Sequence, residues 1–124
     1  MPSFTVTEET WFSAAHALRG FDMCERMHGH NYKVQLQLKS PIVDRSGMVA
    51  DFTVIRQVLD KLLQRFDHQD LNQVKPFDKL NPTAENIAKL VYEEMNLKFN
   101  TRKVKVSTVT VWETDSSFAT YGPH

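Results

Sequence analysis

The sequence predicts an α+β fold in which two amphipathic helices cover one face of a mainly antiparallel sheet. Two observations lead to this prediction. Segments with alternating apolar and polar residues lie toward both ends of the chain, and two segments with a helical spacing of apolar residues lie between them. Residues 1–124 are short enough for one domain, and no linker or internal repeat divides them.

Three strands are expected in the first half of the chain. Residues 4–15 are rich in Thr, Val, Phe and Trp, which is typical of a strand. Residues 28–39 alternate cleanly, so His28 and His30 share one face with an apolar row. Residues 41–47 form a turn region, and Met48–Ala50 is expected to be a short returning strand.

Two helices are expected next. Asp51 can cap a helix that runs to about residue 66, because its apolar residues step by four, three and four: Ile55, Leu59, Leu62 and Phe66. Residues 67–80 are expected to form a loop. Asn81-Pro82-Thr83 then opens a second helix, in which Pro82 suits the first turn and either Asn81 or Thr83 is the cap.

Two β segments, 104–113 and 118–121, complete the order strand, strand, strand, helix, helix, strand, strand. The helices can cover only one face of such a sheet. Its other face and its edges need cover, which predicts a homo-oligomer.

Charge and composition argue against several classes of protein. Fifteen basic residues balance fifteen acidic ones, so the chain lacks the basic excess of a nucleic-acid or anionic-membrane binder. No apolar run approaches the ~20 residues of a membrane helix, and the polar start shows no secretory signal. Cys24 is the only cysteine, which rules out an intramolecular disulfide and favours a reducing, cytoplasmic setting.

The run His28-Gly29-His30 is a candidate metal site. Histidines two residues apart on a strand project side by side, which suits two imidazoles on one zinc ion. His16 is the best third ligand, because a hairpin of the first two strands would bring it to the same end of the sheet. Three histidines leave a fourth position for water or substrate, as catalytic zinc requires. Two alternatives stay open: histidines that are ordinary satisfied polar residues, and a structural zinc site that also uses Cys24.

Cys24 and Glu25 precede this run and are candidate bases. A nearby divalent cation and Arg26 would both favour the Cys24 thiolate, which could then act as a general base or a nucleophile. Glu25 is a second potential base. The alternatives are an inert buried cysteine and a solvated surface carboxylate.

Two carboxylates further along the chain are also candidates. Asp67 directly precedes His68, and a carboxylate beside an imidazole can hold its tautomer and raise its basicity. Taken alone, this pair is better interpreted as a favourable histidine at a helix C-terminus. Glu113 ends the last long strand, where it could accept two parallel hydrogen bonds from an amino-pyrimidinone ring or simply protect a sheet edge.

These segments together resemble a known family. The whole chain is similar to the 6-pyruvoyl-tetrahydropterin synthase family, and most of all to its bacterial branch, the 6-carboxy-5,6,7,8-tetrahydropterin synthases of the queuosine (7-deazaguanine) pathway. Each matching piece is weak alone, but the set is highly specific and spans nearly all of the chain. The pieces are Phe12-Ser13-Ala14-Ala15-His16, Cys24-x-x-x-His28-Gly29-His30, Gly47-Met48-Val49-Ala50-Asp51-Phe52, Leu71-Asn72 after Asp67-His68, Asn81-Pro82-Thr83-Ala84-Glu85-Asn86 and Val111-Trp112-Glu113-Thr114.

The resemblance implies the tunnelling fold (T-fold), with an antiparallel four-stranded sheet and two helices on one face. Subunits of that fold join their sheets into a barrel, and two trimers stack into a hexamer. The implied substrate is 7,8-dihydroneopterin triphosphate, so the chain would be a zinc-dependent lyase.

The resemblance also implies a role for each candidate residue. It implies Zn²⁺ on His16, His28 and His30, Cys24 as the proton acceptor, Asp67 and His68 as its helpers from a neighbouring subunit, and Glu113 as the anchor of the pterin ring. Residues that hold the triphosphate are not implied; Arg26 and Lys33 are guesses made from their charge.

One feature departs from a simple match to the carboxy-forming branch. The spacing from Cys24 to His28 is the short one of that branch, whereas the animal pyruvoyl-forming enzymes have a longer interval. Glu25 also creates Glu-x-x-His-Gly-His, which resembles members that release 6-hydroxymethyl-dihydropterin for folate synthesis with a glutamate base. We therefore hypothesise a dual role in queuosine and folate synthesis. Sole folate-pathway activity, a pyruvoyl-forming synthase and a non-catalytic zinc-stabilised binding module stay open as alternatives.

Overall fold

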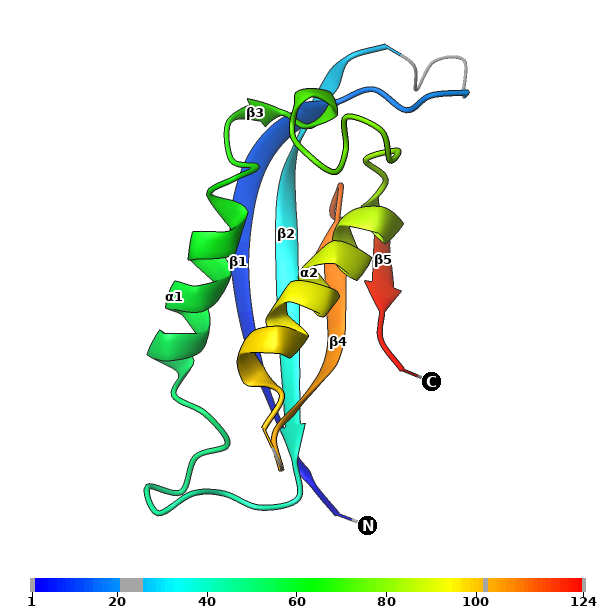
Figure 1. Cartoon of the computed structure of the whole chain (residues 1–124). Coiled ribbons are helices and arrows are strands. Elements are labelled where there is room, and N and C mark those ends of the chain that lie inside the picture. The colour runs from blue at the N-terminus through cyan, green and yellow to red at the C-terminus, as the bar shows by residue number, and fades with distance from the viewer. Residues whose placement is uncertain (1, 21–25, 102, 124) are drawn as a thin grey trace.

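A five-stranded sheet with two helices packed on one face organises the chain (Figure 1). The structure is a computed structural model, and it describes residues 2–20, 26–101 and 103–123. The elements follow in the order β1 (Phe4–His16), β2 (His28–Ser40), α1 (Phe52–Leu63), β3 (Gln69–Asp70), η2 (Leu71–Gln73), α2 (Ala84–Phe99), β4 (Lys105–Trp112) and β5 (Phe118–Tyr121). The predicted α+β class is confirmed.

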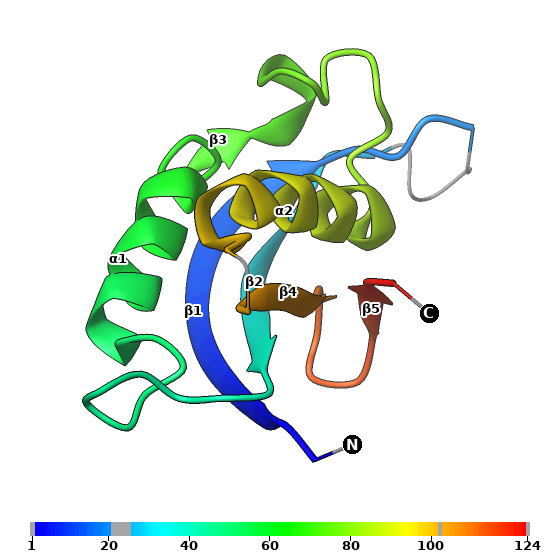
Figure 2. The same cartoon turned by 60° about the horizontal axis from the view of Figure 1, so that its bottom comes forward.

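The sheet has the strand order β3-β1-β2-β4-β5. All pairs are antiparallel except β1 with β3, which run parallel over two residues. The pairing of β1 with β2 is unbroken from Phe4 to His16, and it places His16 directly opposite His28 and Ala14 opposite His30. Figure 2 shows this long pair from another side, with α1 packed on β1 and α2 packed mainly on β4 and β5.

Two expectations about the strands were wrong. Met48–Ala50 is not a strand. The loop before it satisfies its own backbone instead, because the Asp44 carboxylate accepts hydrogen bonds from the Ser46 and Met48 amides and the Asp44 N–H donates to the Met48 carbonyl. The second difference is β3, which lies in the expected loop and makes the sheet five-stranded rather than four-stranded.

Both helices begin where cap chemistry favours a start. Asp51 is the N-cap of α1, and its carboxylate accepts a hydrogen bond of 2.8 Å from the Thr53 amide. Thr83, rather than Asn81, is the N-cap of α2, and its hydroxyl accepts from the Asn86 amide at 3.1 Å. The first helix ends at Leu63, earlier than the expected residue 66, although Phe66 remains buried. Among the described residues, no helix has the length and apolar character needed to cross a membrane.

The two faces of the sheet differ in the way that the alternation along β2 predicts. One face carries a fully buried row that packs under the helices and consists of Tyr32, Val34, Leu36 and Leu38. Burying such a side chain contributes roughly 1.5–3 kcal/mol. The opposite face carries a row of residues that are directly paired across four strands, namely Trp11, Lys33, Trp112 and Phe118. The Lys33 ammonium lies 4.1 Å from the Trp112 ring centroid, and Trp11 remains 59% exposed.

The cap of α1 can be tested by replacing Asp51. An Asp51→Ala variant should lose about 1 kcal/mol of unfolding free energy, because the Thr53 amide loses its acceptor. Asp51→Asn keeps an acceptor and should lose much less. Thermal unfolding at one fixed protein concentration compares the two variants; equal losses would contradict the capping role.

Candidate functional site

The pairing of β1 with β2 brings three histidines together at one end of the sheet. Because His16 and His28 are opposed in the register, their Nε2 atoms lie 3.0 Å apart. His30 is two residues further along the same face of β2. The three ring centroids are separated by 4.6, 5.0 and 5.1 Å. His16 is fully buried, and the other two rings are partly exposed.

Backbone carbonyls determine which nitrogen of two rings carries the proton. His16 Nδ1 lies 2.7 Å from the Pro82 carbonyl oxygen, and His28 Nδ1 lies 2.8 Å from the Arg26 carbonyl oxygen. A carbonyl can only accept, so each Nδ1 is the donor and each Nε2 of a neutral ring keeps its lone pair. Tyr32 Oη lies 3.0 Å from the same His16 nitrogen, and burial raises the pKa of this phenol, which therefore stays neutral.

Glu113 completes the cluster from the end of β4. Its Oε2 atom lies 3.2 Å from His16 Nε2 and 3.2 Å from His30 Nε2. Where His16 Nε2 also carries a proton, its hydrogen bond to Glu113 and the charges of the protonated histidines lower the pKa of this carboxyl, in spite of the opposing effect of burial. The carboxylate is therefore ionised at neutral pH.

His30 is held in the neutral form that a metal ligand needs. Burial is the main cause that lowers its pKa, and His16 and His28 lower it further, whereas Glu113 acts in the opposite direction. Its Nε2 is buried and makes no hydrogen bond among the described residues, although Glu113 Oε2 lies 3.2 Å away. A buried polar atom of this kind is rare and marks a place where a ligand can bind.

The donor set fits a divalent metal ion. Three imidazole nitrogens and one carboxylate oxygen present lone pairs to a common centre, and all lie within 4.8 Å of one another. In tetrahedral zinc sites with bonds of about 2.0–2.1 Å, ligand atoms are about 3.3 Å apart, and the shortest separations here are 3.0 and 3.2 Å. Facing lone pairs at these distances need either a proton on a ring or a cation at the centre. The His16, His28, His30 and Glu113 group, called the metal cluster below, could therefore hold a metal.

The contact of Glu113 with the histidines was not part of the expectation from the sequence, which gave this residue as an anchor of the pterin ring or as protection of a sheet edge. Trp112 is paired with Lys33, so one further step along both strands brings Glu113 beside Tyr32 on the histidine face. The sequence could have predicted this position of Glu113 only if the register between β2 and β4 had been known. Lys33 itself projects from the opposite face of β2, away from the metal cluster.

Asp67 and His68 meet in space at the turn after α1. Asp67 Oδ1 accepts the Ser13 amide at 2.9 Å and lies 3.0 Å from His68 Nδ1. His68 has a left-handed backbone (φ 59°), and its side chain is 81% exposed. The Ser13 hydrogen bond is the main cause that lowers the pKa of Asp67, and His68 adds to it. An ionised carboxylate thus orients an imidazole that is largely exposed.

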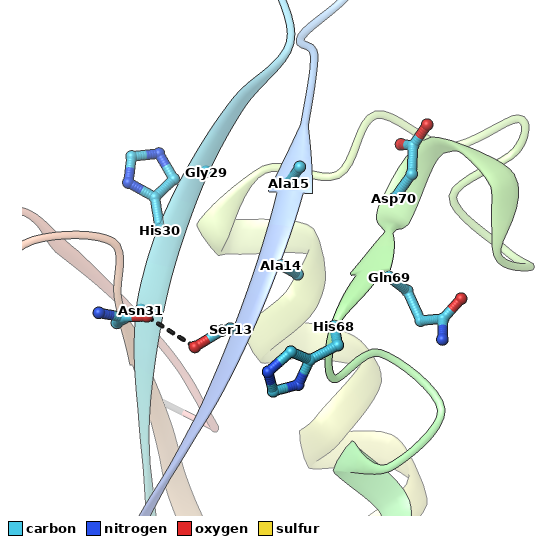
Figure 3. A pocket seen from close by; sticks show the side chains of 9 residues that line it. All are labelled: Ser13, Ala14, Ala15, Gly29, His30, Asn31, His68, Gln69 and Asp70. Carbon is cyan, nitrogen blue, oxygen red and sulfur yellow. Dashed lines mark hydrogen bonds between the residues drawn. The ribbon is translucent and has the colours of Figure 1, made fainter.

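An open pocket of about 540 Å³ is lined by residues of β1, β2 and β3 and by His68, which precedes β3. Figure 3 shows that His30 and His68 reach its lining from different elements and that Ser13 Oγ donates to Asn31 Oδ1, at 2.6 Å. Cys24 and Glu25, the two candidate bases, lie outside the described residues.

The lowered pKa of Asp67 predicts a pH-dependent contribution to stability. The folded chain holds this proton less tightly than the unfolded chain, so the contribution is present above the ordinary carboxyl pKa of about 4 and is lost as the pH falls through the lower, folded value. Asp67→Ala should therefore lower the melting temperature at pH 6, and its deficit relative to the unchanged protein should shrink below pH 4. Thermal melts across this range measure the difference, and a deficit that is constant with pH would contradict the assignment.

Comparison with known proteins agrees with this geometry. The sequence profile described as 6-pyruvoyl tetrahydropterin synthase matches residues 5–124. A Bacillus subtilis protein named 6-carboxy-5,6,7,8-tetrahydropterin synthase is 30% identical over 98% of this chain and 86% of its own length. A Pyrococcus furiosus protein named dihydroneopterin monophosphate aldolase is 32% identical over 82% of each chain.

The fold agrees as well. The solved structure of Caenorhabditis elegans 6-pyruvoyl tetrahydropterin synthase superposes with a TM-score of 0.89 at 28% identity, and the match covers 100% of this chain and 98% of the other. The expected tunnelling fold is therefore the fold of this chain. With the profile matched along nearly its whole length and the same fold in a solved member, the chain belongs to the 6-pyruvoyl tetrahydropterin synthase family.

Proposed function

We propose that the chain is a zinc-dependent 6-carboxy-5,6,7,8-tetrahydropterin synthase that converts 7,8-dihydroneopterin triphosphate in queuosine (7-deazaguanine) synthesis. The observation that carries the proposal is the convergence of three imidazole nitrogens in a chain of this family. The match to the Bacillus subtilis protein over nearly the whole chain supports the choice of the carboxy-forming reaction.

His16, His28 and His30 would hold the zinc. Zinc, when bound, supplies a Lewis acid that makes a proton on the substrate side chain easier to remove. The chain provides the rest of the chemistry. The Glu113 carboxylate would accept two parallel hydrogen bonds from the N–H and NH₂ groups of the pterin ring. Its position beside the histidines would bring the side chain of that substrate to the metal cluster.

Proton movement would fall to Cys24 and to the Asp67–His68 pair. Asp67 would orient the His68 ring through Nδ1, and Nε2 would take or give the proton. The large exposure of His68 supports a role across a subunit boundary, because a catalytic imidazole works best when it is shielded from water by a neighbour. Cys24 as proton acceptor follows from the family resemblance.

We further propose that the chain assembles as a hexamer, a dimer of trimers. The exposed row on the sheet face opposite the helices supports association, since Trp11 and Phe118 are 59% and 58% exposed. The edge of β1 supports it too, because β3 pairs with Ala14 and Ala15, and no other strand among residues 2–20, 26–101 and 103–123 pairs with the rest of that edge.

A second candidate function is release of 6-hydroxymethyl-dihydropterin with Glu25 as the base. Two observations favour it: the run Glu25-Arg26-Met27-His28-Gly29-His30 in the sequence, and the 32% identity to a protein named dihydroneopterin monophosphate aldolase. The two reactions start from the same ring and differ in which bond of the side chain breaks.

Product analysis by mass spectrometry separates the candidates. Zinc-loaded protein incubated with 7,8-dihydroneopterin triphosphate should yield 6-carboxytetrahydropterin. If hydroxymethyl-dihydropterin also forms, Glu25→Ala should abolish it and spare the carboxy product. A pyruvoyl product would assign the chain to the other branch of the family. A folded, zinc-loaded protein that consumes no substrate would contradict the enzymatic proposal and favour a zinc-stabilised binding module.

The zinc ligands can be tested apart from turnover. Changes to groups around a metal site typically weaken binding by about 10–100-fold, so loss of a ligand in His28→Ala should weaken zinc binding by at least about 100-fold. His68→Ala is the matched control and should bind zinc as the unchanged protein does. Competition titration with a chelator gives both affinities, and equal losses in the two variants would contradict the ligand assignment.

A further inference from the structure

Two asparagine side chains hold the segment that follows His16. Asn72 Oδ1 accepts the Ala17 amide at 2.8 Å, and Asn72 Nδ2 donates to the Ala17 carbonyl at 3.0 Å. In the same way, Asn81 Oδ1 accepts the Arg19 amide at 2.9 Å, and Asn81 Nδ2 donates to the Arg19 carbonyl at 3.2 Å. A side-chain amide has the same donor and acceptor as a peptide group, so each asparagine replaces one residue of a neighbouring strand.

These amides act where the sheet ladders stop. The pairing of β1 with β2 ends at His16, and β3 pairs only with Ala14 and Ala15 before the chain turns away. The end of a strand frays unless its backbone groups are paired. Asn72 pairs with the backbone of Ala17 on the side of β1 where β3 lies, directly after His16. Asn81 pairs with the backbone of Arg19, two residues later.

The asparagines are themselves held in place. The backbone N–H of Asn72 donates to Asp70 Oδ1 at 3.0 Å, which fixes the turn from β3 into η2. The Asn81 carbonyl accepts from Asn86 Nδ2 at 2.8 Å and from the Thr83 amide at 2.9 Å, so it is attached to the first turn of α2.

The segment that contains Asn81 also contacts the metal cluster directly. Pro82, which follows Asn81, provides the carbonyl that accepts from His16 Nδ1 at 2.7 Å. The Arg19 guanidinium donates to the carbonyls of Phe77 and Asp78, each at 3.1 Å. These hydrogen bonds attach the segment that follows His16 to the loop before α2. His16 is therefore restrained at its ring and through the backbone that follows it.

We propose that Asn72 and Asn81 are positioning residues for the metal ligand His16. By pairing with both backbone groups of Ala17 and Arg19, they keep the end of β1 from fraying and hold His16 Nε2 opposite His28 Nε2. This inference rests on the metal site of the proposed function. It extends that site to two residues that belong neither to the metal cluster nor to the lining of the pocket in Figure 3.

Zinc affinity of single variants tests the proposal. Asn72→Ala and Asn81→Ala should each weaken zinc binding by about tenfold, at the lower end of the effect of outer-shell groups. Asn100→Ala is the matched control, because Asn100 also makes a side-chain hydrogen bond, to Lys105 Nζ, but lies at the far end of α2. It should bind zinc as the unchanged protein does. Cobalt substituted for zinc should show altered visible bands in the two test variants only.

Weaker metal binding in both variants, with circular dichroism and core amide protection unchanged, supports the proposal. Unchanged zinc affinity together with a lowered melting temperature would mean that the asparagines only stabilise the loop, and would overturn it. If an alanine variant does not fold, Asn72→Gln keeps the amide but moves it by one methylene and should weaken zinc in the same way. If the unchanged protein binds no zinc at the histidines, the proposed function fails first, and the inference fails with it.

Discussion

The convergence of lone pairs at the end of β1 and β2 is the constraint on which the rest of this site depends. His16, His28, His30 and Glu113 direct acceptor atoms at one centre, with separations of 3.0–3.2 Å between the closest atoms. Such a group is unfavourable without a positive charge at its centre. The surrounding structure holds it in this arrangement, because the carbonyls of Pro82 and Arg26 fix the proton on Nδ1 of two rings.

The sheet serves two purposes through its two faces. The face under the helices carries the core row of β2 and, continuing at the same parity, His30 and His28, so packing and ligand placement depend on one strand register. A one-residue slip of β2 would move the histidines to the opposite face together with the whole apolar row. The large hydrophobic cost of that slip therefore protects the metal cluster as well as the core. The opposite face, with its exposed aromatic residues, is left for association.

The sequence allowed the local features to be predicted, and the long-range ones only in part. Alternation along residues 28–39 gave β2 its faces, and cap chemistry located the start of α1 at Asp51. Met48–Ala50 was wrongly expected to be a strand because its composition does not show that Asp44 closes the loop on itself. Glu113 beside the histidines, and Asn72 and Asn81 on the backbone after His16, depend on contacts between residues 55 or more positions apart. No local pattern contains that information, although the family resemblance had marked all three positions.

Anomalous diffraction from crystals grown with zinc can show whether the three histidines bind the metal. Data collected above and below the zinc absorption edge locate the metal without any assumption about chemistry. We predict one strong peak per chain, about 2.0–2.1 Å from the Nε2 atoms of His16, His28 and His30. A peak elsewhere, or no peak at these histidines in a protein that contains stoichiometric zinc, would contradict this prediction.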